Sequence, residues 1–152
     1  MNIILWAISA FFIGSLVEWI AHRYILHNFK IKKLSKFHFG RHHKKSRKNM
    51  GYDKDYLKFP PSSLEEGLHE IYSLILIVAI ATPLILVSVW LWVFLMIHAC
   101  AYYYLHRKMH LEPAWCRKYF SWHWRHHMGK DQNCNWGVTT PIFDYIFNTV
   151  KK

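Results

Sequence analysis

Histidine dominates the chemistry available to this chain. Ten of its twelve histidines fall into four short groups, and each group borders a strongly apolar segment or follows one after a short basic stretch. Neutral imidazole is the commonest metal ligand among side chains, and its second ring nitrogen can bond to a neighbour that orients the ring. The pattern therefore indicates a metal site beside a membrane. The groups are His22 and His27; His38, His42 and His43; His106 and His110; and His123, His126 and His127.

The number of these histidines indicates two metal ions. A tetrahedral zinc site needs only four ligands, whereas ten imidazoles provide about five nitrogens for each of two metals and leave a coordination position open. The three cysteines, Cys100, Cys116 and Cys134, are too widely separated to form a metal motif. A structural zinc site is therefore disfavoured.

The spacing of three groups predicts ligands that share a helical face. Residues three or four positions apart lie on one face of a helix and can converge on one metal. Adjacent residues instead diverge by about 100°, so an adjacent pair is suited to supplying two metals. The pairs with the convergent spacing are His38–His42, His106–His110 and His123–His126, and the adjacent pairs are His42–His43 and His126–His127.

The first group has a different spacing. His22 and His27 are five residues apart, which separates them by roughly 140° on an ideal α-helix. They can converge only if the helix unwinds or forms a π-bulge at this point, a distortion that is often found at functional sites.

Two apolar segments must position these groups. From Met1 to Ala21 the only charged residue is Glu18, and a helix of this length spans about 30 Å, the thickness of a bilayer core. A cleaved signal peptide is the competing interpretation, but the segment lacks a basic start and a small-residue cleavage site. We therefore expect a retained transmembrane helix at about residues 2–21.

The second apolar segment, residues 71–105, contains no Asp, Glu, Lys or Arg. As one helix it would be about 50 Å long, too long for a single crossing, and Pro83 lies near its middle. We expect a hairpin of helices at about 64–82 and 84–105 with its turn at Pro83. At its start Ser62 or Ser63 can cap the first helix, with Glu65 or Glu66 completing a capping box.

The charge distribution predicts the topology. All 20 Lys and Arg residues lie in segments 22–70 and 106–152. By the positive-inside rule both segments are cytoplasmic, with the N-terminus and the Pro83 turn outside. Residues 1–152 then form one all-α integral membrane domain with about three transmembrane helices and a cytoplasmic, histidine-rich dimetal cap. The net charge of +11 could indicate nucleic-acid binding, but the two uncharged membrane segments argue against it.

Several carboxylates are candidates for orienting the metal ligands. Glu18 lies one helical turn before His22 at membrane depth, where an ionisable side chain is a functional hypothesis by default. We expect Glu18 to pair with a ligand histidine, Arg23 or Arg107. Asp144, Glu112 and Asp131 are further candidates. Outside the groups, His69 is not expected to be a ligand and His98 is expected to pack in the helical region.

Four segments and the C-terminal region resemble the fatty acid hydroxylase superfamily, which includes fatty acid 2-hydroxylases, sterol desaturases and carotenoid hydroxylases. The segments similar to its histidine boxes are Glu18 to His27, Phe37 to His43, Tyr104 to His110 and Trp122 to His127, and Asn135 to Thr149 is similar to its usual ending. The similarity covers most of the chain and is specific for the superfamily but much less so for the substrate.

This resemblance implies a non-haem centre of two iron ions that uses O₂ to oxidise a C–H bond of a lipid. It assigns all ten grouped histidines as ligands, with zinc able to replace iron on purification. It also implies a separate electron donor, such as a ferredoxin, a cytochrome or a reductase, in a bacterial inner membrane or the endoplasmic reticulum. The short chain is consistent with a homodimer.

We favour hydroxylation of a fatty acyl lipid. A carotenoid or sterol hydroxylase and a lipid desaturase are alternatives, because the first histidine box also resembles small carotenoid hydroxylases. A membrane protein that binds or transports metal is the non-enzymatic alternative, although a transporter is expected to place polar ligands within the bilayer.

Overall fold

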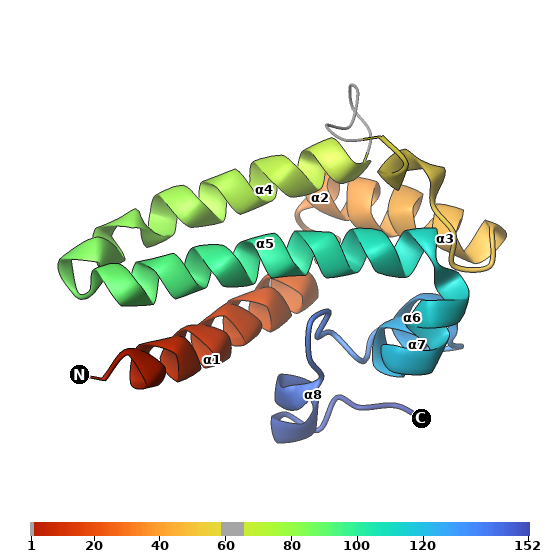
Figure 1. Ribbon diagram of the computed structural model, residues 1–152. Helices are drawn as coiled ribbons and strands as arrows, with labels where there is room; N and C mark the ends of the chain where they lie inside the picture. The colour runs from red at the N-terminus through yellow and green to blue at the C-terminus, as the bar shows by residue number, and fades with distance from the viewer. Residues whose placement is uncertain (1, 59–65) are drawn as a thin grey trace.

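The computed structural model describes residues 2–58 and 66–152, and only the backbone from 66 to 69. These residues form helices and connecting loops without a strand, as predicted. Figure 1 shows three long helices side by side, with the shorter helices gathered mainly around one end of them. The three long helices therefore form an apolar stalk, and the shorter helices with their loops form a polar head.

The first long helix, α1 (Ile3–Ala21), runs against the third, α5 (Val89–Leu111) (Figure 1). Ala10 is buried against Leu91 and Leu95 of α5. One turn further along, a Cβ atom on Gly14 would lie only 2.5 Å from the His98 ring. The lack of a side chain at Gly14 therefore allows the two helices to approach closely, and His98 packs between them as expected.

The predicted hairpin is present, but its turn is not at Pro83. Helix α4 (Glu66–Ala81) continues into the 3₁₀ helix η4 (Thr82–Leu86), and Ser88 caps α5. Pro83 lies in the first turn of η4, where its missing N–H removes no helical hydrogen bond, so the chain reverses four residues later. The expected caps at Ser62 and Ser63 with Glu65 lie outside the described residues, and Glu66, whose side chain is not described, begins α4.

Helix α5 is also longer than predicted. It continues through His106 and His110 to Leu111, because nothing interrupts its hydrogen bonding until Glu112, which precedes Pro113. The helix therefore carries the third histidine group out of the apolar stalk in one rigid piece.

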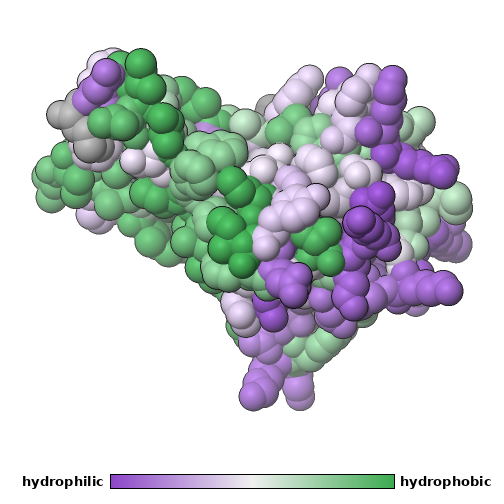
Figure 2. Space-filling model, turned by 90° about the horizontal axis from the view of Figure 1, so that it is seen from below, coloured by the Kyte–Doolittle hydropathy of each residue, from purple (hydrophilic) through white to green (hydrophobic). Residues whose placement is uncertain are grey.

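The stalk exposes large apolar side chains on all three helices. Ile4, Leu76 and Ile80 are each more than half exposed, and Figure 2 shows apolar residues over the stalk with polar residues gathered on the head. Segments Ile3–Leu26 and Val89–Leu111 are long and apolar enough to cross a membrane. The described apolar segment Glu70–Leu86 is shorter, so a third crossing remains a prediction.

The head is built from short elements. The π-helix η1 (His22–Leu26) extends α1 and is followed by α2, η2 and α3, while α6, α7 and α8 follow α5. Met109, Cys116 and Val138 form its small apolar core. The remaining bounds are α2 Lys32–Phe37, η2 His38–His43, α3 Lys44–Lys48, η3 Lys54–Tyr56, α6 Pro113–Tyr119, α7 Ser121–Met128 and α8 Ile142–Ile146.

Candidate metal centre

Nine histidines of the head converge in two adjoining clusters in space, and from here on these two clusters are called the first and the second group. In each group one nitrogen from every ring lies within 4.8 Å of the corresponding nitrogens of the other rings. Because all nine come from the predicted set of ten, the sequence pattern identified the residues that the fold assembles. The first group is His22, His27, His38, His43 and His126, and the second is His42, His106, His110 and His127.

Two π-helices create the first group. In η1 the chain is wound more loosely than an α-helix, so the five-residue spacing brings the rings of His22 and His27 to 5.1 Å. The predicted distortion at this position is confirmed. The sequence did not indicate that η2 is also a π-helix, which brings His38 and His43 into the same group by the same spacing.

The π-helical winding of η2 changes which of the predicted histidine pairs belong to the same group. His38 and His42 were expected to converge on one metal, but the π-helix directs them into different groups. His106 and His110 do converge, with Nε2 atoms 3.2 Å apart. The adjacent pair His42–His43 divides between the two groups as predicted.

The fourth histidine segment, Trp122 to His127, also contributes histidines to both groups. Its adjacent residues His126 and His127 belong to the first and second groups respectively, as predicted. His123 was expected to join His126, but its Nε2 lies 3.4 Å from Nε2 of His110, beside the second group. With His123 included, the head provides about five imidazoles for each of two ions.

The Nδ1 atoms of several rings face oxygen atoms that can only accept hydrogen bonds. Nδ1 of His22 donates to the Trp136 carbonyl at 2.6 Å, and Nδ1 of His126 donates to the Cys134 carbonyl at 2.6 Å. A neutral imidazole has one proton, so when Nδ1 holds it, Nε2 presents a bare lone pair. These acceptors therefore fix the tautomer that binds metal through Nε2.

The Nε2 atoms of the first group lie close to one another. They are separated by 2.9 Å between His22 and His38, and by 3.2 Å between His126 and His43. Two nitrogens that each lie about 2.1 Å from one ion are about 3.0 Å apart at a right angle and about 3.4 Å apart at a tetrahedral angle. The separations therefore fit metal ligation.

The second group supports the same conclusion. Within the described part of the chain, Nε2 of His42 and Nε2 of His127 find no hydrogen-bond partner although both are buried. A buried nitrogen without a partner is costly, and a metal ion would satisfy it. The residues present therefore fit two metal ions.

Burial keeps these imidazoles neutral. Desolvation, reinforced by His126, lowers the pKa of His27 to about 3, and desolvation lowers the pKa of His126 to about 4 despite its hydrogen bond to Cys134. Desolvation and neighbouring histidines also hold the pKa of His43 and His127 well below 6.5. At neutral pH these four rings are therefore unprotonated, the state that a metal requires.

Two carboxylates that the sequence analysis missed lie beside histidines of the second group, and one of them, Glu70, is hydrogen-bonded to its histidine. Oε1 of Glu70 accepts from Nδ1 of His106 at 2.8 Å, and the Tyr56 hydroxyl donates to Oε2 of Glu70. Oδ2 of Asp53 lies 3.5 Å from Nδ1 of His42, and Asp53 is completely buried. The signal for Glu70 was its position at the start of the uncharged segment, whereas nothing in the sequence marked Asp53.

A tight turn supplies another acceptor. Gly51 has φ of +88°, and a Cβ atom there would lie 2.5 Å from the Trp124 ring, so only glycine fits. The turn brings the Gly51 carbonyl to 3.0 Å from Nδ1 of His110.

Glu18 and Asp144 act on the first group through the backbone. Glu18 accepts hydrogen bonds from the N–H groups of Val138 and Thr139, and Asp144 accepts from the N–H groups of Trp136 and Gly137. Together they fix the loop whose Trp136 carbonyl orients His22. The expected direct contact of either carboxylate with a grouped histidine does not form.

The other candidate pairings do not form in the described residues either. Arg23 stacks on Trp19 and Tyr24, and Arg107 donates to the Leu57 carbonyl, so neither pairs with Glu18. Glu112 lies 4.0 Å from Lys108, and Asp131 lies 3.7 Å from Lys151, both at the surface. The side chain of His69 lies outside the described residues.

Comparison with known proteins gives one result. The model of a protein family described as fatty acid hydroxylase matches residues 7–149, which include both histidine groups and the loop held by Asp144. No curated protein and no solved structure matches the chain.

We predict that the two groups bind metal separately. His126→Ala removes a nitrogen from the first group and His110→Ala from the second, so each purified variant should retain about one ion instead of two. Plasma emission spectrometry on protein loaded with ferrous iron measures this. Asp131→Asn is the surface control and should retain both ions; equal metal content in all four proteins would refute the assignment.

Glu70→Gln should weaken the second group alone. Losing the charged acceptor of His106 is expected to lower metal affinity about 10- to 100-fold, while one ion stays tightly bound. Competition titration with a chelator measures both affinities. Glu112→Gln removes an exposed carboxylate as the matched control, and a similar loss in that variant would contradict a specific role for Glu70.

The metal-free protein should lose stability in acid. Because burial lowers the pKa of His27 to about 3 and of His126 to about 4, the unfolded chain, with histidine pKa near 6.5, binds protons first as pH falls. Stability is therefore full above about pH 6.5 and declines towards pH 4. Thermal unfolding in detergent with a chelator tests this, and a midpoint that stays constant or rises in acid would contradict it.

Proposed function

The chain belongs to the fatty acid hydroxylase family, and from that membership we propose that it hydroxylates a C–H bond of a fatty acyl lipid with two iron ions and O₂. The observation that carries the proposal is the pair of adjoining imidazole groups at the end of an apolar stalk. Such a position places a metal centre where a lipid chain can reach it from the bilayer.

The proposed reaction requires two electrons from a separate donor protein. A C–H bond breaks and a C–O bond forms with one oxygen atom of O₂, and the other atom leaves as water after taking up two electrons and two protons. Bound iron supplies the oxygen activation and redox chemistry that no side chain provides. A separate reductase, ferredoxin or cytochrome supplies the electrons, and the basic head can attract an acidic protein of this kind.

The residues of the chain hold and orient this centre. His22, His106 and His126 are each fixed through Nδ1, so their Nε2 atoms are set before a metal binds. Every member of the two groups is buried except the half-buried His38, and His126 is 0% and His42 only 1% exposed. Enclosure keeps bulk water from the reacting atoms, which protects a reactive centre from side reactions.

Metal transport is a poorer account of the same residues. A transporter needs ligands spaced along a path through the bilayer, whereas here the nine grouped histidines meet in one compact volume. Their burial and fixed tautomers favour a resident ion over one in transit.

Cells that express the chain should contain an oxidised lipid. We expect a lipid heavier by about 16 mass units, because hydroxylation adds one oxygen atom, and its loss in cells that carry His126→Ala. Lipid mass spectrometry of cells with and without the chain measures it. A product lighter by about 2 mass units would indicate desaturation instead of hydroxylation. A modified carotenoid or sterol would show that the substrate is not a fatty acyl lipid. Unchanged lipids would refute the enzymatic proposal.

We further propose that α1, α4 with η4, and α5 each cross the membrane, with the head in the cytoplasm. The support is the absence of Lys and Arg from the stalk beyond the head. Reporters fused after Lys152 and inserted after Met50 should both report cytoplasm, and one inserted between Val87 and Ser88 the opposite side. A report of opposite sides for the first two would overturn both this topology and the shared metal centre.

A further inference from the structure

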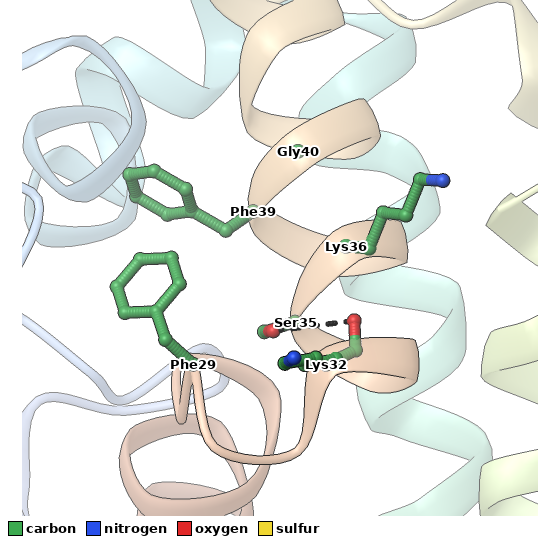
Figure 3. Close-up of a pocket in the computed structure, with 6 residues that line it drawn as sticks. All are labelled: Phe29, Lys32, Ser35, Lys36, Phe39 and Gly40. Carbon is green, nitrogen blue, oxygen red and sulfur yellow. Dashed lines mark hydrogen bonds between the residues drawn. The ribbon is translucent and has the colours of Figure 1, made fainter.

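The head contains a surface hollow that the metal centre does not use. Its volume is about 310 Å³, and Figure 3 shows the side chains around it. The phenyl rings of Phe29 and Phe39 lie on one side with centroids 5.4 Å apart, while Lys36 extends on the other. We call this site the basic hollow; it is lined by Phe29, Lys32, Ser35, Lys36, Phe39 and Gly40.

The basic hollow lies just beyond the end of the first proposed membrane helix, where lipid headgroups would meet the protein. The apolar segment Ile3–Leu26 ends three residues before Phe29. Phe29 is 63% exposed, and Ile31 and Leu34 beside it are also exposed. Apolar and aromatic side chains at the end of a membrane helix are typical of the bilayer interface.

The surrounding charge selects an anionic ligand. Between Leu26 and Asp53 the chain has nine Lys and Arg residues and no Asp or Glu. Lys32 and Lys36 are one helical turn apart, so both ammonium groups can reach one phosphate while their methylene stems cover the apolar wall. The Ser35 hydroxyl donates to the carbonyls of Ile31 and Lys32, so the ammonium groups of Lys32 and Lys36 are the side-chain donors that remain for a ligand of the hollow (Figure 3).

We propose that the basic hollow binds the headgroup of an anionic phospholipid of the surrounding bilayer. Lys32 and Lys36 contact the phosphate, and Phe29 and Phe39 pack against the start of the acyl chains. The Phe39 ring also lies 5.3 Å from the ring of His27 and is stacked on His43 at 5.4 Å. A lipid bound here therefore braces the η2 segment that carries ligands of the first group.

Lipid retention tests the proposal without using enzyme activity. The full chain is placed in nanodiscs of phosphatidylcholine with and without phosphatidylglycerol, and native mass spectrometry measures which lipids stay bound. Each lysine at an anionic surface contributes about fivefold to binding, so Lys32→Gln with Lys36→Gln should lower the preference for phosphatidylglycerol about 10- to 30-fold. Lys130→Gln with Lys152→Gln removes the same charge from two other exposed lysines and should leave the preference unchanged.

A second variant tests the cavity itself. A Cβ atom on Gly40 would meet only the Lys36 stem at 3.8 Å, so Gly40→Leu can occupy the hollow without removing a charge and should also lower the preference. Metal content confirms that each variant is folded. Equal preference in the wild type and both hollow variants, or an equal loss in the control pair, would overturn the proposal. So would loss of acidic redox-protein binding with unchanged lipid retention, which would make the surface a protein docking site.

Discussion

Packing so many imidazoles into one enclosed volume is the physical constraint on which the rest of the structure depends. Each ring loses its hydration, and the Nε2 atoms of neighbouring rings lie about 3 Å apart. The arrangement is stable only if the outer nitrogens are hydrogen-bonded and the inner ones share a cation. Acceptors around the head meet the first requirement for His22, His106, His110 and His126, and the separations of the Nε2 atoms fit the second.

This constraint explains why distant parts of the chain meet at the head. Carbonyl acceptors come from the Gly51 turn and from the C-terminal loop at Cys134 and Trp136. A carboxylate acceptor comes from Glu70 near the start of α4, and the Asp53 carboxylate before η3 lies 3.5 Å from Nδ1 of His42. The loop is held in turn by Glu18 of α1, so the stalk and both histidine groups form one connected structure.

The sequence predicted which histidines converge because their spacing carries the information. The five-residue interval of His22 and His27 required a distorted helix, and the adjacent pairs required two groups. It could not predict that η2 is a π-helix, because the interval from His38 to His42 also fits an α-helix. Nor could it pair carboxylates with ligands, since Asp53 and Glu18 find their partners only through tertiary packing. The turn at Pro83 was misplaced because proline is equally compatible with the first turn of a new helix.

The central claim is that the two groups of imidazoles hold two separate ions. Anomalous diffraction at the iron absorption edge, from crystals of the iron-loaded full chain, tests it most directly. The account predicts two peaks, one among the Nε2 atoms of His22, His38 and His126 and one among those of His42, His106 and His110. A single peak, or peaks bound outside the head, would contradict it.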